Sequence, residues 1–159
     1  MTPIPRLAIA AFLASAAAAA PEAARFTAQQ LEAVFYFDLG ADSVDVSDYP
    51  KAQRGNYAAF VAVCSRCHTL ARPINSPIAA AADWRRYVRR MHVRSKSQAD
   101  KTFDKEQIRG IVDFLAYDSR IRKIAGKSAF DAETQRLKKL FAEVRAEAVK
   151  TDQRRTEKP

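Results

Sequence analysis

The sequence predicts an all-α protein built around one folded domain. Apolar residues recur at helical spacing in several segments, and two of these segments open with a capping box. No segment repeats at a fixed period, and no alternation of strands and helices follows the cysteines. A chain of 159 residues is long enough for one domain with a core of its own.

Residues 1 to 19 are predicted to form a signal peptide. Arg6 precedes an apolar run, and Ala17 and Ala19 supply the small residues expected before a cleavage site. The run is too short to span a bilayer comfortably, and a retained N-terminal anchor is the alternative. There is no twin arginine, so the predicted route is Sec-type export to the periplasm. The mature chain has no predicted transmembrane segment.

The first helix of the mature chain is predicted over residues 27 to 37, where Thr27 and Gln30 form a capping box. A loop follows, with a short extended piece at Val44 and Val46. The next helix leads into the cysteines, because apolar residues recur there at i, i+3, i+4 and i+7: Tyr57, Phe60, Val61 and Cys64.

Two more helices follow the cysteines. The first carries a stripe at the same spacing: Trp84, Tyr87, Val88 and Met91. Either Asp83 caps this helix, or Ser76 with Pro77 starts it earlier. The second opens with the capping box of Asp104 and Gln107 and buries a stripe of four residues: Ile108, Ile111, Val112 and Leu115.

Residues 25 to 122 form the predicted domain, and residues 123 to 150 form a predicted amphipathic helical extension. This helix either packs on the domain or binds a partner, and its apolar face carries Leu137, Leu140, Phe141 and Val144. Residues 151 to 159 are predicted to be a disordered tail.

The two cysteines of the chain, Cys64 and Cys67, are followed directly by His68, and three chemistries compete for this motif. Redox disulfides of this spacing follow a strand in a βαβ unit, whereas the flanks here are helical. A closed zinc site needs four ligands, and His92 does not lie at zinc-finger spacing from His68. The third chemistry is the c-type haem attachment motif, Cys-x-x-Cys-His.

Haem attachment explains every position of the motif, so we expect one haem c bound covalently through Cys64 and Cys67. Each thiol adds to one vinyl group of the porphyrin, and two intervening residues place both sulfurs beneath the two vinyls. His68 then presents its imidazole to the iron. Because haem is attached to an unfolded chain after export, the signal peptide and the motif support each other.

Met91 is the predicted second axial ligand. Apart from the initiator it is the only methionine, and it lies on the inward stripe of its helix. The rival is His92, about 100° further round the helix on the arginine side, where a solvated surface histidine is expected. We also expect the other ring N–H of His68 to bind the backbone carbonyl of Pro73 or Pro77.

On these residues the chain resembles a monohaem class I c-type cytochrome of the small bacterial periplasmic kind, over residues 50 to 122. Phe60 lies four residues before the motif, and a later helix carries an aromatic–Leu pair, Phe114 and Leu115. The resemblance implies a helical domain wrapped around the haem, in which the first and last helices cross and these aromatics meet. The chain departs from the family at Asn56, where a glycine is usual.

The resemblance implies a protein that transfers one electron and is not an enzyme, because both axial positions of the iron are filled. The alternatives are an electron-accepting subunit of a dehydrogenase, and a haem sensor or weak peroxidase with a labile methionine. Three residues are candidates to hold the haem propionates: Arg72, Trp84 and Tyr87.

The chain is basic, with a formal net charge of +9 at pH 7. Because export removes the protein from nucleic acid, the charge leaves an anionic membrane surface or an acidic protein as the partner. Positive residues crowd the helix that carries Met91: Arg85, Arg86, Arg89, Arg90, Arg94 and Lys96. We therefore expect a monomeric protein that binds an acidic redox partner.

Overall fold

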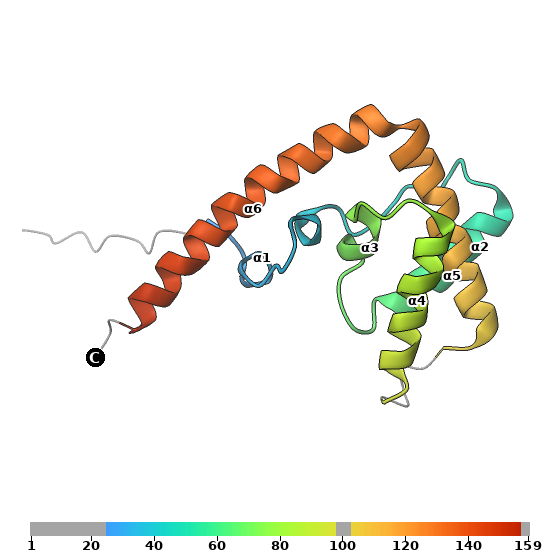
Figure 1. Cartoon of the computed structure of the whole chain (residues 1–159), viewed down its shortest axis with the longest axis horizontal. Coiled ribbons are helices and arrows are strands. Elements are labelled where there is room, and N and C mark those ends of the chain that lie inside the picture. The colour runs from blue at the N-terminus through green and yellow to red at the C-terminus, as the bar shows by residue number, and fades with distance from the viewer. Residues whose placement is uncertain (1–24, 98–102, 157–159) are drawn as a thin grey trace, which may run out of the picture.

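The computed structural model describes residues 25 to 97 and 103 to 156, and all regular structure in these ranges is helical (Figure 1). The predicted all-α class is therefore confirmed, whereas the predicted signal peptide lies outside the described residues. None of the helices in these ranges combines the length and apolar character that crossing a bilayer requires. In chain order the elements are α1 (Ala28–Leu31), the 3-10 helix η1 (Tyr36–Leu39), α2 (Lys51–Cys64), α3 (Ala71–Asn75), α4 (Ala81–Ser95), α5 (Lys105–Asp118), the π-helix η3 (Ser119–Ala125) and α6 (Lys127–Thr156).

Aromatic side chains fill the contact between α2 and α5. The rings of Phe60 and Phe114 are fully buried with their centroids 5.2 Å apart, and the ring of Tyr57 lies 5.0 Å from that of Phe114. Such pairs stabilise a fold by about 0.5–1.5 kcal/mol beyond the area that they bury. The predicted meeting of Phe60 and Phe114 is confirmed.

Gly110 of α5 lies against the side chain of Asn56 on α2. A Cβ atom at this position would lie only 2.8 Å from Oδ1 of Asn56. The small residue of this contact therefore belongs to α5, while α2 carries the larger Asn56. A glycine on the facing helix thus leaves room for the side chain of Asn56.

The helix α4 packs against α5 and begins at Ala81, after both Ser76 and Pro77. Its N-cap is Ala80, which makes no side-chain hydrogen bond, so neither predicted start is correct. Asp83 instead lies in the first turn, where its carboxylate interacts favourably with the helix dipole and pairs with Arg86. The predicted inward stripe is confirmed, because its members are buried or half-buried: Trp84, Tyr87, Val88 and Met91.

The first helix is much shorter than the predicted span of residues 27 to 37, because α1 ends at Leu31. The carboxylate of Asp38 accepts hydrogen bonds from the backbone N–H groups of Val34 and Phe35, at 3.1 and 3.0 Å. A side chain therefore satisfies donors that a longer helix would have paired with its own carbonyls.

The predicted capping boxes are confirmed, whereas the predicted extended piece is not. The capping boxes of α1 and α5 are both present: Thr27 with Gln30, and Asp104 with Gln107. The extended piece predicted at Val44 and Val46 forms no strand, and these side chains pack against the apolar core instead. Their burial satisfies the apolar pattern without any strand pairing.

The helix α6 extends away from α2, α4 and α5, and the N-terminal segment with α1 lies beside it (Figure 1). Its 30 residues give a length of about 45 Å. Leu137 and Val144 on its apolar face are buried, as are Phe26 and Ala33 of the N-terminal segment. The extension thus packs on the segment that precedes α2, with η1 and η3 at its base.

The same helix continues to Thr156, so residues 151 to 156 are helical and the prediction of a disordered tail there is wrong. Arg154 forms an ion pair with Glu147 at 2.9 Å, and the Thr151 hydroxyl donates to the carbonyl of Glu147 at 3.0 Å. Such contacts one or two turns apart support a helix that the apolar pattern alone does not extend.

Candidate functional site

A cavity of about 250 Å³ lies among α2, α4 and α5, and it brings together the residues of the motif and the predicted second axial ligand. Cys64, Cys67 and His68 line it from the end of α2 and the turn that follows, and Met91 lines it from α4. Most of the remaining wall is apolar: Phe60, Val63, Val88, Phe103, Ile111 and Leu115.

The end of α2 places the motif at the cavity. Cys64 is the last residue of the helix, and the next three residues form a turn that leaves Cys67 exposed and His68 half-buried. The N–H of Ser65 donates to the carbonyl of Val61 at 3.3 Å, and Nε of Arg66 donates to that of Ala62 at 2.9 Å. These bonds satisfy carbonyls that the end of a helix would otherwise leave unpaired.

The imidazole of His68 has a defined orientation. Its Nδ1 lies 2.8 Å from the carbonyl oxygen of Thr69. A carbonyl can only accept, so Nδ1 carries the proton and the lone pair of Nε2 remains available for a metal. The prediction that the carbonyl of Pro73 or Pro77 accepts this hydrogen bond is therefore wrong. The carbonyl of the next residue in the chain lies close enough to accept it.

The two thiols differ in their surroundings. Both cysteines are free, with Cys64 half-buried and Cys67 exposed. Burial, and to a smaller extent the neighbouring Cys67, raise the pKa of the Cys64 thiol to about 12. Redox-active Cys-x-x-Cys motifs need a thiol whose pKa is lowered. The surroundings of Cys64 therefore suit a sulfur that forms one permanent covalent bond better than a thiolate that is repeatedly oxidised and reduced.

Of the three residues predicted to hold propionates, only Tyr87 lines the cavity. Desolvation raises the pKa of its phenol. Trp84 is fully buried and donates its indole N–H to Oγ of Ser119 at 2.9 Å, away from the cavity wall.

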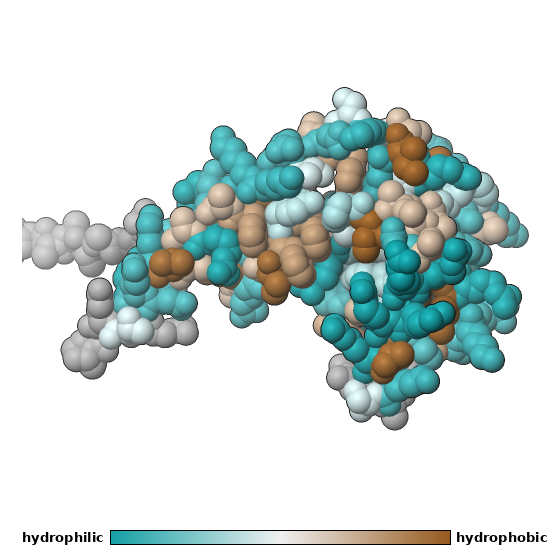
Figure 2. Space-filling model, viewed as in Figure 1, coloured by the Kyte–Doolittle hydropathy of each residue, from teal (hydrophilic) through white to brown (hydrophobic). Residues whose placement is uncertain are grey.

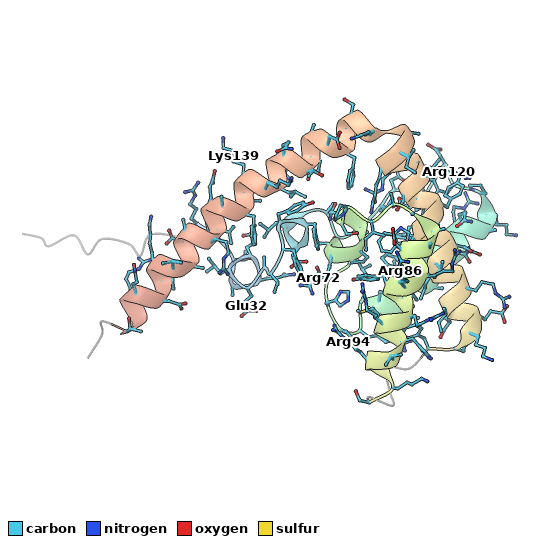
Figure 3. All side chains as sticks on the ribbon, viewed as in Figure 1. Glu32, Arg72, Arg86, Arg94, Arg120 and Lys139 are labelled. Carbon is cyan, nitrogen blue, oxygen red and sulfur yellow. The ribbon has the colours of Figure 1, made fainter. Side chains whose placement is uncertain are left out.

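Arg72 is instead engaged by Asp38. Its Nε and one terminal nitrogen bind the two carboxylate oxygens at 2.7 and 2.8 Å, and its guanidinium lies 5.2 Å from the ring of Phe35. The label in Figure 3 marks Arg72 beside α3. Sequence reasoning missed this pair because Asp38 is 34 residues earlier in the chain.

Arg94 and Ser95 line the cavity although the sequence analysis did not assign them to it. They follow Met91 by three and four residues, so helical spacing could have identified them. Arg94 is exposed, and Ser95 is buried with its hydroxyl bonded to the carbonyl of His92 at 2.9 Å. Arg94 brings a positive charge to the rim of an otherwise apolar site.

His92 is not the solvated surface histidine that was predicted. It is half-buried, and its ring packs edge-on against Phe103 with centroids 5.1 Å apart. Its Nδ1 is buried without a hydrogen-bond partner among the described residues. Phe103 covers this side of α4 from the start of α5, which helical phase alone could not show. Met91, and not His92, lines the cavity.

The outer side of α4 is strongly positive. Hydrophilic side chains gather over this helix in Figure 2, and Figure 3 labels Arg86 and Arg94 on it. The six predicted cations are all exposed: Arg85, Arg86, Arg89, Arg90, Arg94 and Lys96. Within the described ranges, only Arg86 among them forms an ion pair, with Asp83. Among the described residues, the positive charge of this face is therefore largely uncompensated.

No family model matches the chain, and comparisons with curated proteins and with solved structures found no match. The function must therefore be inferred from the site itself.

Proposed function

We propose that this protein is an exported electron-transfer protein of the class I c-type cytochrome kind. It carries one haem, bound covalently through Cys64 and Cys67, with His68 and Met91 as axial ligands. The observation that carries the proposal is that one cavity is lined by all four of these residues. The motif and the methionine are well separated in sequence, so no local pattern forces them into one site.

The residues around the cavity fit such a group. The pair of thiols can form two thioethers, and a neutral imidazole with a thioether sulfur is a common axial set for haem iron. The Thr69 carbonyl holds the His68 ring in the tautomer that leaves Nε2 free. Most of the wall is aromatic or aliphatic, which suits the apolar face of a porphyrin.

Haem bound in this way supplies a one-electron couple, and the protein adjusts its potential. Methionine as a ligand raises the potential, as does an apolar wall that disfavours the added charge of the ferric state. Met91 and His68 would fill both axial positions, so the site favours electron transfer over chemistry on a bound substrate. A peroxidase or gas sensor would require Met91 to leave.

The redox partner of the protein is an acidic protein that docks over α4. The exposed cations of this helix lie on the element that also supplies Met91 and Tyr87 to the cavity. A partner bound there would approach the haem closely, and the uncompensated charge would speed its association. The predicted signal peptide places this exchange in the periplasm.

The proposal is tested by exporting the chain in cells that attach haem to proteins. Wild type should retain its haem after denaturation, because thioethers survive unfolding. The Cys64→Ala/Cys67→Ala double variant should lose it, whereas Ser65→Ala, which alters one of the two residues between the cysteines, should retain it. If denatured wild type releases haem or never contains it, the proposal is wrong.

A further inference from the structure

Lys123 is a buried lysine that forms no ion pair with a carboxylate among the residues that the structure describes. The residue belongs to the π-helix η3 and is only 7% exposed. Its Nζ donates to the backbone carbonyls of Ser76 at 2.9 Å, Ile78 at 3.0 Å and Pro73 at 3.5 Å. An ammonium group has three N–H donors, so these three carbonyls match its capacity.

Arg122, the preceding residue, also binds the segment of residues 73 to 78. One of its terminal nitrogens donates to the carbonyl of Ile74 at 2.9 Å. The guanidinium also forms two bonds with the buried carboxylate of Asp118, at 2.7 and 2.6 Å, and this carboxylate accepts from the hydroxyl of Tyr49 at 3.1 Å. Asp118 therefore holds the guanidinium of Arg122 in the position from which it donates to the carbonyl of Ile74.

Two of the carbonyls that these cations bind have a second side-chain donor: that of Pro73 accepts from the Ser76 hydroxyl at 3.1 Å, and that of Ile78 from the Ser119 hydroxyl at 3.4 Å. The helix α3 is only five residues long, so its last carbonyls lack helical donors. Ser76 precedes Pro77 and has extended backbone angles, φ −62° and ψ 154°, as expected before a proline. Buried carbonyls without donors are costly, so Arg122 and Lys123 satisfy a requirement that the local backbone cannot meet.

Two consecutive residues of the π-helix η3, Arg122 and Lys123, donate to backbone carbonyls of the same segment. Its wider turn ends where the N–H of Gly126 donates to the carbonyl of Ile121, five residues earlier, at 2.9 Å. A Cβ at Gly126 would lie 2.9 Å from the carbonyl oxygen of Arg122, so this turn favours glycine. π-Turns inside helices are frequent at functional sites.

The network continues into α4. The hydroxyl of Ser119, the first residue of η3, accepts the indole N–H of Trp84 at 2.9 Å and lies 3.4 Å from the carbonyl of Ile78. Nζ of Lys123 also lies 4.9 Å from the centre of the Trp84 ring. Trp84 is two helical turns before Met91, so η3 fixes both the segment before α4 and the first turn of that helix.

We propose that Arg122 and Lys123 are positioning residues that hold the segment between His68 and Met91 and thereby set the separation of the two axial ligands. The inference rests on the proposed haem function and extends it. His68 is fixed by the end of α2, whereas Met91 reaches the cavity only if residues 73 to 84 hold α4 in place. Four carbonyls and one indole of that stretch are bound by η3.

Lys123→Met tests the proposal, because methionine keeps the length of the side chain but cannot donate. In the reduced holoprotein, carbon monoxide should bind about tenfold faster, because the Ser76 carbonyl loses its donor, the carbonyls of Pro73 and Ile78 each lose one of two, and Met91 is held less firmly. The far-red band that reports the sulfur–iron bond in the ferric protein should weaken. Lys139→Met, on the exposed side of α6 (Figure 3), is the matched control and should change neither.

Ser119→Ala removes only the hydroxyl that bonds to Trp84 and Ile78, and it tests the proposal if Lys123→Met does not fold. It should speed carbon monoxide binding in the same direction by a smaller factor. A purely structural network would lower the unfolding midpoint and leave the band and the binding rate of the folded variants at wild-type values. That result would overturn this inference alone. Wild type without covalent haem would instead refute the proposed function, and this inference with it.

Discussion

At the scale of single residues, the contacts of His68 and Arg72 show what a motif can and cannot predict. The spacing of Cys64, Cys67 and His68 predicted a shared site, and all three line one cavity. The carbonyl that fixes His68 is that of Thr69, and the partner of Arg72 is Asp38. A motif specifies the atoms that react, whereas their hydrogen-bond partners depend on how the backbone turns afterwards.

Met91 and His92 are neighbours with different environments, and replacing each in turn tests the assignment of the second ligand. Met91→Ala should abolish the far-red band of the ferric protein and lower the midpoint potential, because the iron loses its sulfur ligand. His92→Ala should change neither quantity. Near-infrared absorption and potentiometry measure both. If His92→Ala removes the band instead, the ligand assignment is wrong.

The pKa of Lys123 links the free energy of unfolding to pH. Burial, and then Arg122, lower this pKa to about 7, against the opposing effect of Asp118. Between about pH 7 and 10.5 the unfolded chain therefore binds more protons than the folded one, so the free energy of unfolding rises with pH there. The slope from one group is at most about 1.4 kcal/mol per pH unit.

Urea unfolding of the holoprotein at a series of pH values measures this slope. Lys123→Met should lose the contribution, so the difference in unfolding free energy between wild type and variant should grow from pH 7 to pH 10. Lys139→Met should follow wild type. A constant difference between wild type and Lys123→Met across this range would contradict the lowered pKa.

At the scale of elements, apolar periodicity predicted α2, α4 and α5 well, because their stripes meet in one core. It failed where side chains bind the backbone. Asp38 ends the first helical segment early, and periodicity did not predict the π-helix η3, from which Arg122 and Lys123 bind backbone carbonyls of residues 73 to 78. The length of α6 was also underestimated, because ion pairs rather than apolar residues support its last turns.

The positive face of α4 should govern how fast the partner binds. Arg86→Glu/Arg90→Glu should slow electron transfer with an acidic redox protein by about tenfold at low salt, and the difference should shrink as ionic strength rises. Both side chains are exposed, so the fold should be retained despite the loss of the ion pair between Arg86 and Asp83. Stopped-flow mixing over a range of salt concentrations measures the effect.

A matched control reverses two exposed cations away from α4. Arg120 lies on η3 and Lys139 on α6, and both are labelled in Figure 3. Arg120→Glu/Lys139→Glu changes the net charge equally but should leave most of the rate intact. Equal slowing by both double variants would show that net charge, and not the α4 face, steers the partner.

At the scale of the whole molecule, the cavity is a large part of a small core. It occupies about 250 Å³ beside the crossing of α2 and α5. A void costs about 24 cal/mol per Å³, so leaving it empty would cost at most about 6 kcal/mol. That upper bound is comparable with the whole free energy of unfolding of a typical domain, about 5–15 kcal/mol.

The fold should therefore depend on its cofactor. Cys64→Ala/Cys67→Ala should leave a chain with weakened helical circular dichroism that proteases digest rapidly, because the space between α2, α4 and α5 is no longer filled. Ser65→Ala, with haem attached, should resist digestion as wild type does. A double variant that stays helical and protease-resistant would indicate that the motif serves another purpose.

The visible and near-infrared spectrum of the purified, exported wild-type protein tests the central claim most directly. The account predicts the spectrum of a low-spin c-type haem in the reduced state, with the far-red sulfur-to-iron band in the ferric state. That result would mean that Cys64, Cys67, His68 and Met91 act as one site, as the cavity that they line suggests. A colourless protein, or one whose iron lacks the sulfur band, would contradict it.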